Sequence, residues 1–271
     1  MPENKLAFVL QLADNALILG HRISEWCGHG PILEQDIALT NIALDHLGQA
    51  RSLFQYAADL YNALPKESQK EFISSPLLQQ QSTAATEDSL AYLRDSWDFR
   101  NVLLTEQPNQ DWAFTIARSF YYDHYAVLFY SELSKSTDLR LAAIAEKSLK
   151  EVQYHQRWSS EWVIRLGDGT TESKQKMQTA IEELWPYTGE LFATSDAEKA
   201  VAQQLHILPL EQLKTVWEEN TTAVLNEATL TTQDSKAWMQ SGGKEGRHSE
   251  HLGYILAEMQ YMQRAYPNME W

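Results

Sequence analysis

The chain has 271 residues, of which 44% are hydrophobic, so it can form a substantial packed core and is not a disordered chain. Its formal net charge of −15 at pH 7 argues against binding to nucleic acids and to anionic membrane surfaces. The single cysteine, Cys27, excludes both a disulfide framework and a cysteine-rich metal site.

Helical patterns separated by breakers run along the whole chain. Glycine and proline are scarce, at 11 and 8 residues, which favours helix over sheet. A first helix is expected over residues 3–26, ending at the Gly-His-Gly-Pro of residues 28–31, and a second over residues 34–63, ending before Pro65. After a less regular stretch, further helices are expected over residues 86–105, 110–136, 138–166, 173–192, 209–230 and 244–265.

Four of these predicted helices are long, and one longer connection separates the first pair of them from the second pair. This arrangement predicts an all-α, ferritin-like four-helix bundle with additional peripheral helices, in a single domain over residues 1–271. The core helices are those over residues 3–26, 34–63, 110–136 and 138–166, and a C-terminal extension covers about residues 173–271. The N-terminus lacks the features of a signal peptide, and no apolar run approaches the roughly 20 residues that span a bilayer. We therefore expect a cytoplasmic protein.

A ferritin-like bundle holds two irons when two of its helices each contribute an inward Glu and the other two each contribute Glu-x-x-His. On the first predicted helix, the centre of the apolar stripe holds no carboxylate. Asp14, His21 and Glu25 lie on a separate polar stripe of the same helix. We interpret that stripe as a contact with another helix or with a partner subunit, because a ligand role would require a rotated helix.

The second predicted helix places His46 in the middle of its inward face. The residue three positions earlier is Ala43, and the alternative frame that starts at Asp45 leads to Gly48. Neither frame supplies an acid and a histidine together at the ligand spacing. His46 is therefore predicted to be a hydrogen-bonded core histidine rather than a metal ligand.

The next two long helices also carry polar groups inward. Asp123 lies where a di-iron enzyme has its single carboxylate. His155 is central on the following helix, but Val152 stands three residues before it, and Glu151 is four residues before it rather than three. Because the ligand set is incomplete, we predict no catalytic residue, no cofactor-binding residue and no bound metal in this chain.

These polar residues predict a buried network in place of the irons. Asp123, Glu151 and His155, together with His46, are expected to hydrogen-bond to one another at the centre of the bundle. A single weakly bound metal ion is the alternative that this pattern leaves open.

Two further histidines, His248 and His251, flank Glu250 near the start of the last predicted helix. Such a cluster can hold a metal ion, but short clusters of this kind are common. We interpret it as a set of hydrogen bonds at the helix start or as a second contact with a partner subunit.

Several long segments resemble the C subunits of phenylacetyl-CoA epoxidases, in the same order along the chain. The resemblance covers nearly the whole chain, apart from about residues 66–87 and 195–212. The segments are ALILGHRISEWCGHGP (16–31), DIALTNIALDHLGQAR (36–51), EQPNQDWAFTIAR (106–118), KEVQYHQRWSSEWVIRLGDGTTESKQKMQ (150–178) and GGKEGRHSEHLGYILAEMQYMQRAYP (242–267). His46 is a departure, because an apolar residue is expected at that core position in this family.

The resemblance implies a multicomponent monooxygenase of aerobic phenylacetate degradation that epoxidises the aromatic ring of phenylacetyl-CoA. In that family, a related catalytic A subunit holds the di-iron centre, and a reductase that carries FAD and an iron–sulfur cluster delivers electrons from NADPH. The C subunit pairs with the A subunit and is regarded as structural. The resemblance also implies that this chain forms a hetero-oligomer with the A subunit and the other epoxidase subunits, or a homodimer when it is isolated.

We therefore expect a non-catalytic structural subunit that contacts neither nucleic acid nor membrane. The alternative is an active di-iron oxygenase with a rearranged metal site, which requires bound irons and oxygen consumption by this chain alone. An iron-storage protein is a third hypothesis, and the missing ligands argue against it.

Overall fold

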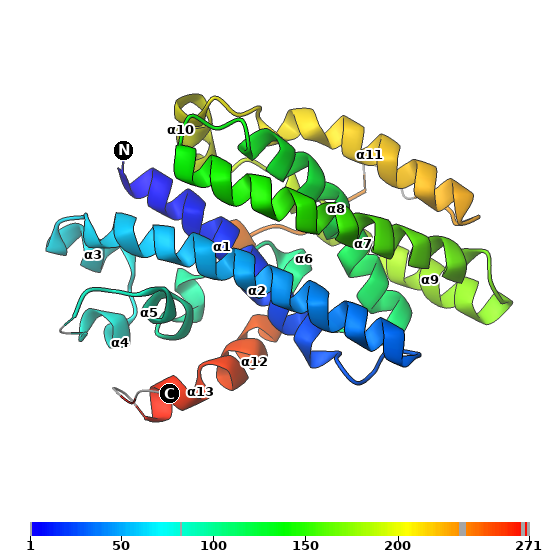
Figure 1. Ribbon diagram of the computed structural model, residues 1–271, viewed down its shortest axis with the longest axis horizontal. Helices are drawn as coiled ribbons and strands as arrows, with labels where there is room; N and C mark the ends of the chain where they lie inside the picture. Colours follow the sequence, from blue (N-terminus) through cyan, green and yellow to red (C-terminus); the bar gives the residue numbers. More distant parts are fainter. Residues whose placement is uncertain (1, 82, 233–236, 267–268, 270–271) are drawn as a thin grey trace.

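Four long helices form the centre of the computed structural model, which describes residues 2–81, 83–232, 237–266 and 269 (Figure 1). They are α1 (Pro2–Glu25), α2 (Leu33–Asn62), α7 (Trp112–Leu133) and α8 (Leu139–Gly167). Helices α1 and α2 form one antiparallel hairpin, and α7 and α8 form the other. No strand occurs in the described residues, so the predicted all-α, ferritin-like bundle is confirmed.

Helix α1 is buried along most of its length. Every residue from Phe8 to Gly20 is buried, because neighbours cover this helix on all sides. Contrary to our expectation, α1 is long and apolar enough to cross a membrane by length and composition. However, 89% of its most apolar window is buried inside the structure, and the core helix of a folded domain passes the same test.

The long connection between α2 and α7 wraps one side of the α1–α2 hairpin (Figure 1). The continuous helix predicted over residues 86–105 is wrong. Arg94 and Asp98 interrupt it, because the Arg94 guanidinium donates to the Asp98 carbonyl (2.9 Å) and the Asp98 carboxylate accepts from the Ser74 backbone N–H (2.9 Å). The connection contains α3 (Lys66–Phe72), α4 (Pro76–Gln79), α5 (Glu87–Tyr92), the 3-10 turn η1 (Ser96–Asp98) and α6 (Leu103–Glu106).

The C-terminal third of the chain surrounds the bundle with shorter helices (Figure 1). Helices α9 and α11 pack against α7 and α8, and α10 packs against α1. In the core between them, the Trp217 indole N–H of α11 donates to the Tyr121 carbonyl of α7 (3.1 Å). The helices are α9 (Thr171–Leu184), α10 (Asp196–Leu205), α11 (Leu210–Glu227), α12 (Glu250–Met259) and α13 (Tyr261–Ala265).

Two of the C-terminal predictions need correction, and one helix there was not predicted. The helix predicted over residues 173–192 ends at Leu184, near Pro186, and continues as the 3-10 turns η2 (Trp185–Tyr187) and η3 (Gly189–Leu191). The helix predicted over residues 244–265 starts only after Ser249 caps α12, because Gly246 has a φ of +82°. Before it lies η4 (Gly243–Glu245). Helix α10 was not predicted, although Ser195 and Glu198 form a capping box at its start.

We predict that Gly167→Ala destabilises the fold, whereas Gly48→Ala does not. A Cβ at Gly167 would meet the carbonyl of Ala228, and it would also lie 3.0 Å from Leu230, whereas a Cβ at Gly48 meets nothing within 4 Å. Overpacking against backbone should lower the free energy of unfolding by about 1–3 kcal/mol. Gly48→Ala should instead raise it by about 0.5–1 kcal/mol, because both residues lie in helices and alanine is the better helix former. Thermal unfolding followed by circular dichroism compares the two variants, and equal melting temperatures would contradict this account.

Candidate functional site

Three polar side chains meet at the centre of the bundle. His46 comes from α2, Asp123 from α7 and His155 from α8, and their exposed fractions are 0%, 1% and 0%. Each offers one possible ligand atom, and these three atoms lie within 4.8 Å of one another. The sequence predicted this convergence, because each of the three residues lies near the middle of an inward helix face.

The inward atoms of this cluster lack hydrogen-bond partners. Both ring nitrogens of His46, the Oδ1 atom of Asp123 and the Nδ1 atom of His155 are buried and unpaired. The His46 and His155 rings lie with centroids 5.0 Å apart and their planes inclined by 49°. The predicted mutual hydrogen bonds are therefore not what the structure has, since the three groups are neighbours without bonding to one another.

The outward atoms of the same groups are held firmly. The Ser159 hydroxyl donates to Asp123 Oδ2 at 2.8 Å. His155 Nε2 lies 3.0 Å from Asp45 Oδ2, and because a carboxylate accepts, the ring proton resides on Nε2. The Nδ1 atom of His155 is buried without a partner.

Glu151 lies outside the cluster, so its predicted place in the network is wrong. Its carboxylate accepts from the Gln49 amide at 2.9 Å and lies 3.6 Å from the ammonium of Lys147. Asp45 takes its place beside His155. Asp45 lies next to His46 in the sequence. It was not predicted to belong to the cluster, because the residue three positions later is Gly48 rather than a histidine.

Burial controls the protonation of this centre. Desolvation lowers the pKa of His46 well below its usual value, and the neighbouring His155 lowers it further. Desolvation raises the pKa of Asp123 to about 7, although His155 and the hydrogen bond from Ser159 oppose the shift. Without a cation, His46 is therefore neutral at pH 7 and Asp123 is only partly ionised.

The residues at this centre do not fit a di-iron site. Such a site needs two inward carboxylates that precede histidines by one helical turn, and those positions hold Ala43 and Val152. It also needs a carboxylate from the first helix, but the Asp14 carboxylate forms an ion pair with Arg94. We therefore derive no oxygen chemistry through two irons in this chain.

Asp14 is not a contact residue for a partner subunit, which corrects one of the predicted interface positions. Its carboxylate is 0% exposed and forms an ion pair with the Arg94 guanidinium, which is also 0% exposed. The second carboxylate oxygen lies 3.1 Å from the same guanidinium and accepts from the Arg100 backbone N–H at 2.9 Å. This pair connects α1 to the long connection between α2 and α7.

His248 is also an internal residue. Its ring nitrogens lie 2.9 Å from the Glu106 carboxylate and 3.0 Å from the Phe99 carbonyl, and its side chain is only 4% exposed. The expected hydrogen bonds at the start of the last helix are therefore present, but this side chain faces inward rather than towards a partner.

The other predicted contact residues lie at one end of the bundle. Glu25 is exposed and pairs with Arg22 at 2.7 Å, and Arg22 also donates to the backbone carbonyl of His251 at 3.3 Å. The two predicted contact surfaces are thus adjacent. His21 is half-buried, and burial lowers its pKa.

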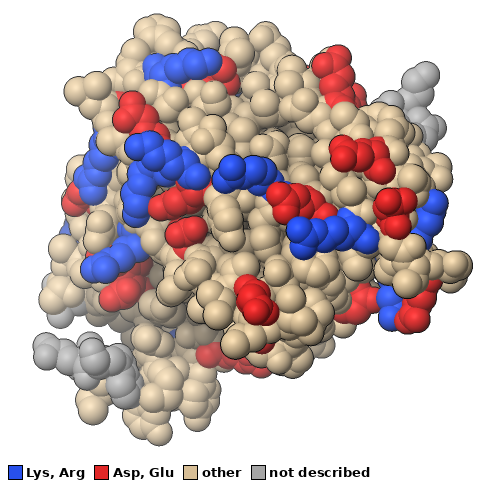
Figure 2. Space-filling view, turned by 45° about the vertical axis from the view of Figure 1, so that its right-hand side comes forward, with Lys and Arg blue, Asp and Glu red and all other residues tan. Residues whose placement is uncertain are grey.

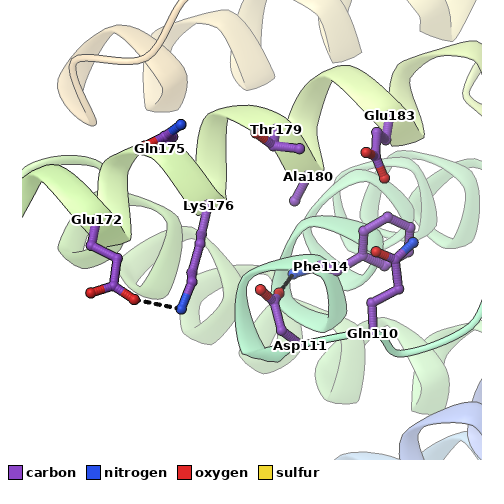
Figure 3. Close-up of a pocket in the computed structure, with 9 residues that line it drawn as sticks. All are labelled: Gln110, Asp111, Phe114, Glu172, Gln175, Lys176, Thr179, Ala180 and Glu183. Atoms are coloured by element: carbon purple, nitrogen blue, oxygen red, sulfur yellow. Dashed lines mark hydrogen bonds and ion pairs between the residues drawn. The ribbon is translucent and has the colours of Figure 1, made fainter.

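Five surface hollows among the described residues have linings that contain none of His46, Asp123 and His155. Figure 3 shows one of about 280 Å³ between the start of α7 and helix α9, where Glu172 pairs with Lys176 at 2.7 Å. Its lining mixes polar residues with Phe114 and Ala180, and it lies on the outside of the bundle. On the face that Figure 2 shows, Lys and Arg side chains lie among Asp and Glu, so this face offers no continuous basic surface for a phosphate backbone.

Two comparisons with known proteins agree with the sequence segments described above. A family described as phenylacetic acid catabolic protein matches residues 2–271. The chain belongs to this family. It is also 44% identical, over 265 residues, to the C subunit of the 1,2-phenylacetyl-CoA epoxidase of Escherichia coli (strain K12). That alignment covers 98% of this chain and 98% of its relative, so the resemblance to this family of phenylacetic acid catabolic proteins is confirmed.

We predict that Asp14→Ala lowers the free energy of unfolding by about 3–5 kcal/mol, because it leaves the Arg94 charge buried without a partner. Denaturant titration measures the change. The control is Glu172→Ala, which removes a solvent-exposed ion pair and should not change stability detectably. Replacing both members of the buried pair, with Asp14→Leu and Arg94→Met, should recover part of the loss. A mild effect of Asp14→Ala alone would contradict the importance given to this pair.

Proposed function

We propose that this chain is the non-catalytic structural subunit of a multicomponent phenylacetyl-CoA epoxidase, and that it pairs with the di-iron catalytic A subunit. The observation that carries the proposal is the incomplete ligand set at the centre of a ferritin-like bundle. Ala43 and Val152 stand where carboxylate ligands are needed, and Asp14 is tied to Arg94. The similarity to the C subunit of the Escherichia coli 1,2-phenylacetyl-CoA epoxidase supports the assignment to this complex.

In this proposal, the oxygen chemistry belongs to other chains. The A subunit holds the two irons and the substrate, and a reductase with FAD and an iron–sulfur cluster supplies electrons from NADPH. The present chain stabilises the A subunit and completes the assembly. A related subunit with the same fold but no active site can stabilise the A subunit in this way, because it need not open for substrate and oxygen.

An exposed apolar face at the start of α2 supports a lasting protein contact. Ile32, Leu33, Ile37 and Leu44 have exposed fractions between 53% and 71%. Within α2, Leu33, Ile37 and Leu44 follow helical spacing on one side of the helix. Clustered apolar side chains on a surface are typical of subunit interfaces. We therefore place the contact with the A subunit on this face, which follows the turn after Glu25, the last residue of α1.

The first test compares this chain alone with the reconstituted complex. The chain is loaded anaerobically with ferrous iron and desalted, and its iron content and oxygen consumption are measured. We expect no oxygen consumption by this chain alone, and NADPH-dependent epoxidation only when the A subunit and the reductase are added. About two retained irons per chain, the number that a complete site holds, together with oxygen uptake would instead support the alternative of an active oxygenase.

The second test addresses the contact surface. We predict that Ile37→Glu combined with Leu44→Glu lowers co-purification with the A subunit at least tenfold, because buried charges in an interface are costly. The matched control is Leu139→Glu combined with Val216→Glu, which changes exposed apolar residues elsewhere and should leave the complex intact. Glu25→Lys combined with His251→Glu examines the neighbouring end of the bundle. If the α2 variant co-purified fully with the A subunit, the proposal that this face forms the contact would be wrong.

A further inference from the structure

The buried cluster has the organisation of a metal site rather than of a hydrogen-bonded network. Four buried polar atoms of His46, Asp123 and His155 have no hydrogen-bond partner. One possible ligand atom from each residue belongs to a group of three atoms that lie within 4.8 Å of one another. A network would pair the buried atoms with one another, and the structure has no such pairing.

The outer contacts of the cluster match those of metal ligands. A histidine that binds a metal through one ring nitrogen typically donates its other N–H to a carboxylate, which fixes the ring and the tautomer. His155 makes this contact with Asp45 at 3.0 Å, and Asp123 accepts a hydrogen bond from Ser159 at 2.8 Å. Both side chains are therefore held from outside while their inner atoms remain free.

We propose that His46, Asp123 and His155 bind one divalent transition-metal ion, which connects α2, α7 and α8 at the centre of the bundle. Two imidazoles and one carboxylate suit Zn²⁺, Fe²⁺ or Co²⁺. The nearby carboxylates of Asp123 and Asp45 supply the negative charge that a divalent ion neutralises. This single ion goes beyond the proposed structural role of the chain and does not depend on it.

The spacing of the cluster allows this ion with small side-chain movements. Ligand atoms bound to one such ion at about 2.0–2.2 Å lie roughly 3–4 Å apart. The three atoms already lie within 4.8 Å of one another, and each comes from the middle of a long helix. Rotation of the side chains, without movement of the helices, brings them into range.

The experiment measures metal content in protein produced in medium that contains added Co²⁺ or Zn²⁺, with any affinity tag removed. We expect about one ion per chain in the wild-type protein, together with a visible Co²⁺ absorption band of a site with nitrogen and oxygen ligands. We also expect the melting temperature of the metal-containing protein to exceed that of protein stripped with a chelator.

Variants distinguish this site from adventitious binding. His46→Leu and the isosteric Asp123→Asn should each reduce the retained metal at least tenfold and abolish the metal-dependent shift in melting temperature. Asp45→Asn should weaken binding by about 10–100-fold, because Asp45 acts through His155. The matched control is His124→Gln, since His124 is a buried histidine next to Asp123 whose nitrogens already contact Ser160 and Gln156. It should retain the metal fully.

The outcomes separate this proposal from the proposed function. If the folded wild-type protein contained no metal, the proposal of a bound ion would be wrong and the proposed structural role would be unaffected. Equal metal in the wild-type protein, His46→Leu and Asp123→Asn would place the ion elsewhere and overturn this site. Two irons with oxygen uptake would overturn both the single ion and the structural role. Circular dichroism of each variant establishes that it is folded, and Asp123→Asn keeps the test valid if His46→Leu fails to fold.

Discussion

The burial of unpaired polar groups at the centre of the bundle is the constraint on which the rest of the structure depends. Each buried donor or acceptor without a partner costs about 1–3 kcal/mol, while the net stability of a domain is about 5–15 kcal/mol. His46, Asp123 and His155 together leave four such atoms at one point. Their combined cost is comparable with the net stability of the whole fold. The proposed cation would lower this cost, because one atom of each of the three side chains would become a ligand.

The rest of the molecule is arranged so that this centre stays closed. Helix α1 is enclosed along most of its length, and the Asp14–Arg94 pair ties it to the connection that wraps the α1–α2 hairpin. On the opposite hairpin, α9 and α11 cover α7 and α8 with an aromatic core around Trp217. The cluster lies closest to solvent at Asp45, whose side chain is 36% exposed and contacts His155.

The sequence predicted the parts of the fold that follow from periodicity. The four long helices and the convergence of His46, Asp123 and His155 came from the spacing of apolar residues on one face. The interruption of the helix near Arg94 could not be predicted from this spacing, because it depends on hydrogen bonds to residues far away in the chain. Asp14 was misplaced for the same reason, since a buried charge looks like a surface charge until its partner at position 94 is known.

The details of the cluster were beyond sequence reasoning for a different reason. Spacing on one helix tells which residues share a face, but it does not tell which atoms of facing helices are in contact. Asp45 has no suitable histidine on its own helix, yet it reaches His155 of α8 at 3.0 Å. Glu151 lies one residue away from the ligand register, and this is enough to turn it towards Gln49. Which carboxylate contacts His155, that of Asp45 or that of Glu151, is decided by how α2 packs against α8.

The two proposals, that this chain does not hold two irons and that it binds one divalent ion, have a common electrostatic basis. A complete di-iron site gathers several carboxylates, whose mutual repulsion at the centre of a bundle is tolerable only with two cations present. Ala43 and Val152 remove carboxylates from that centre, so two cations no longer have enough negative charge around them. The remaining carboxylates, Asp45 and Asp123, balance the charge of one divalent ion. A bundle with these residues lacks the carboxylates that two irons need, whereas the proposed single ion uses the charge and the ligands that are present.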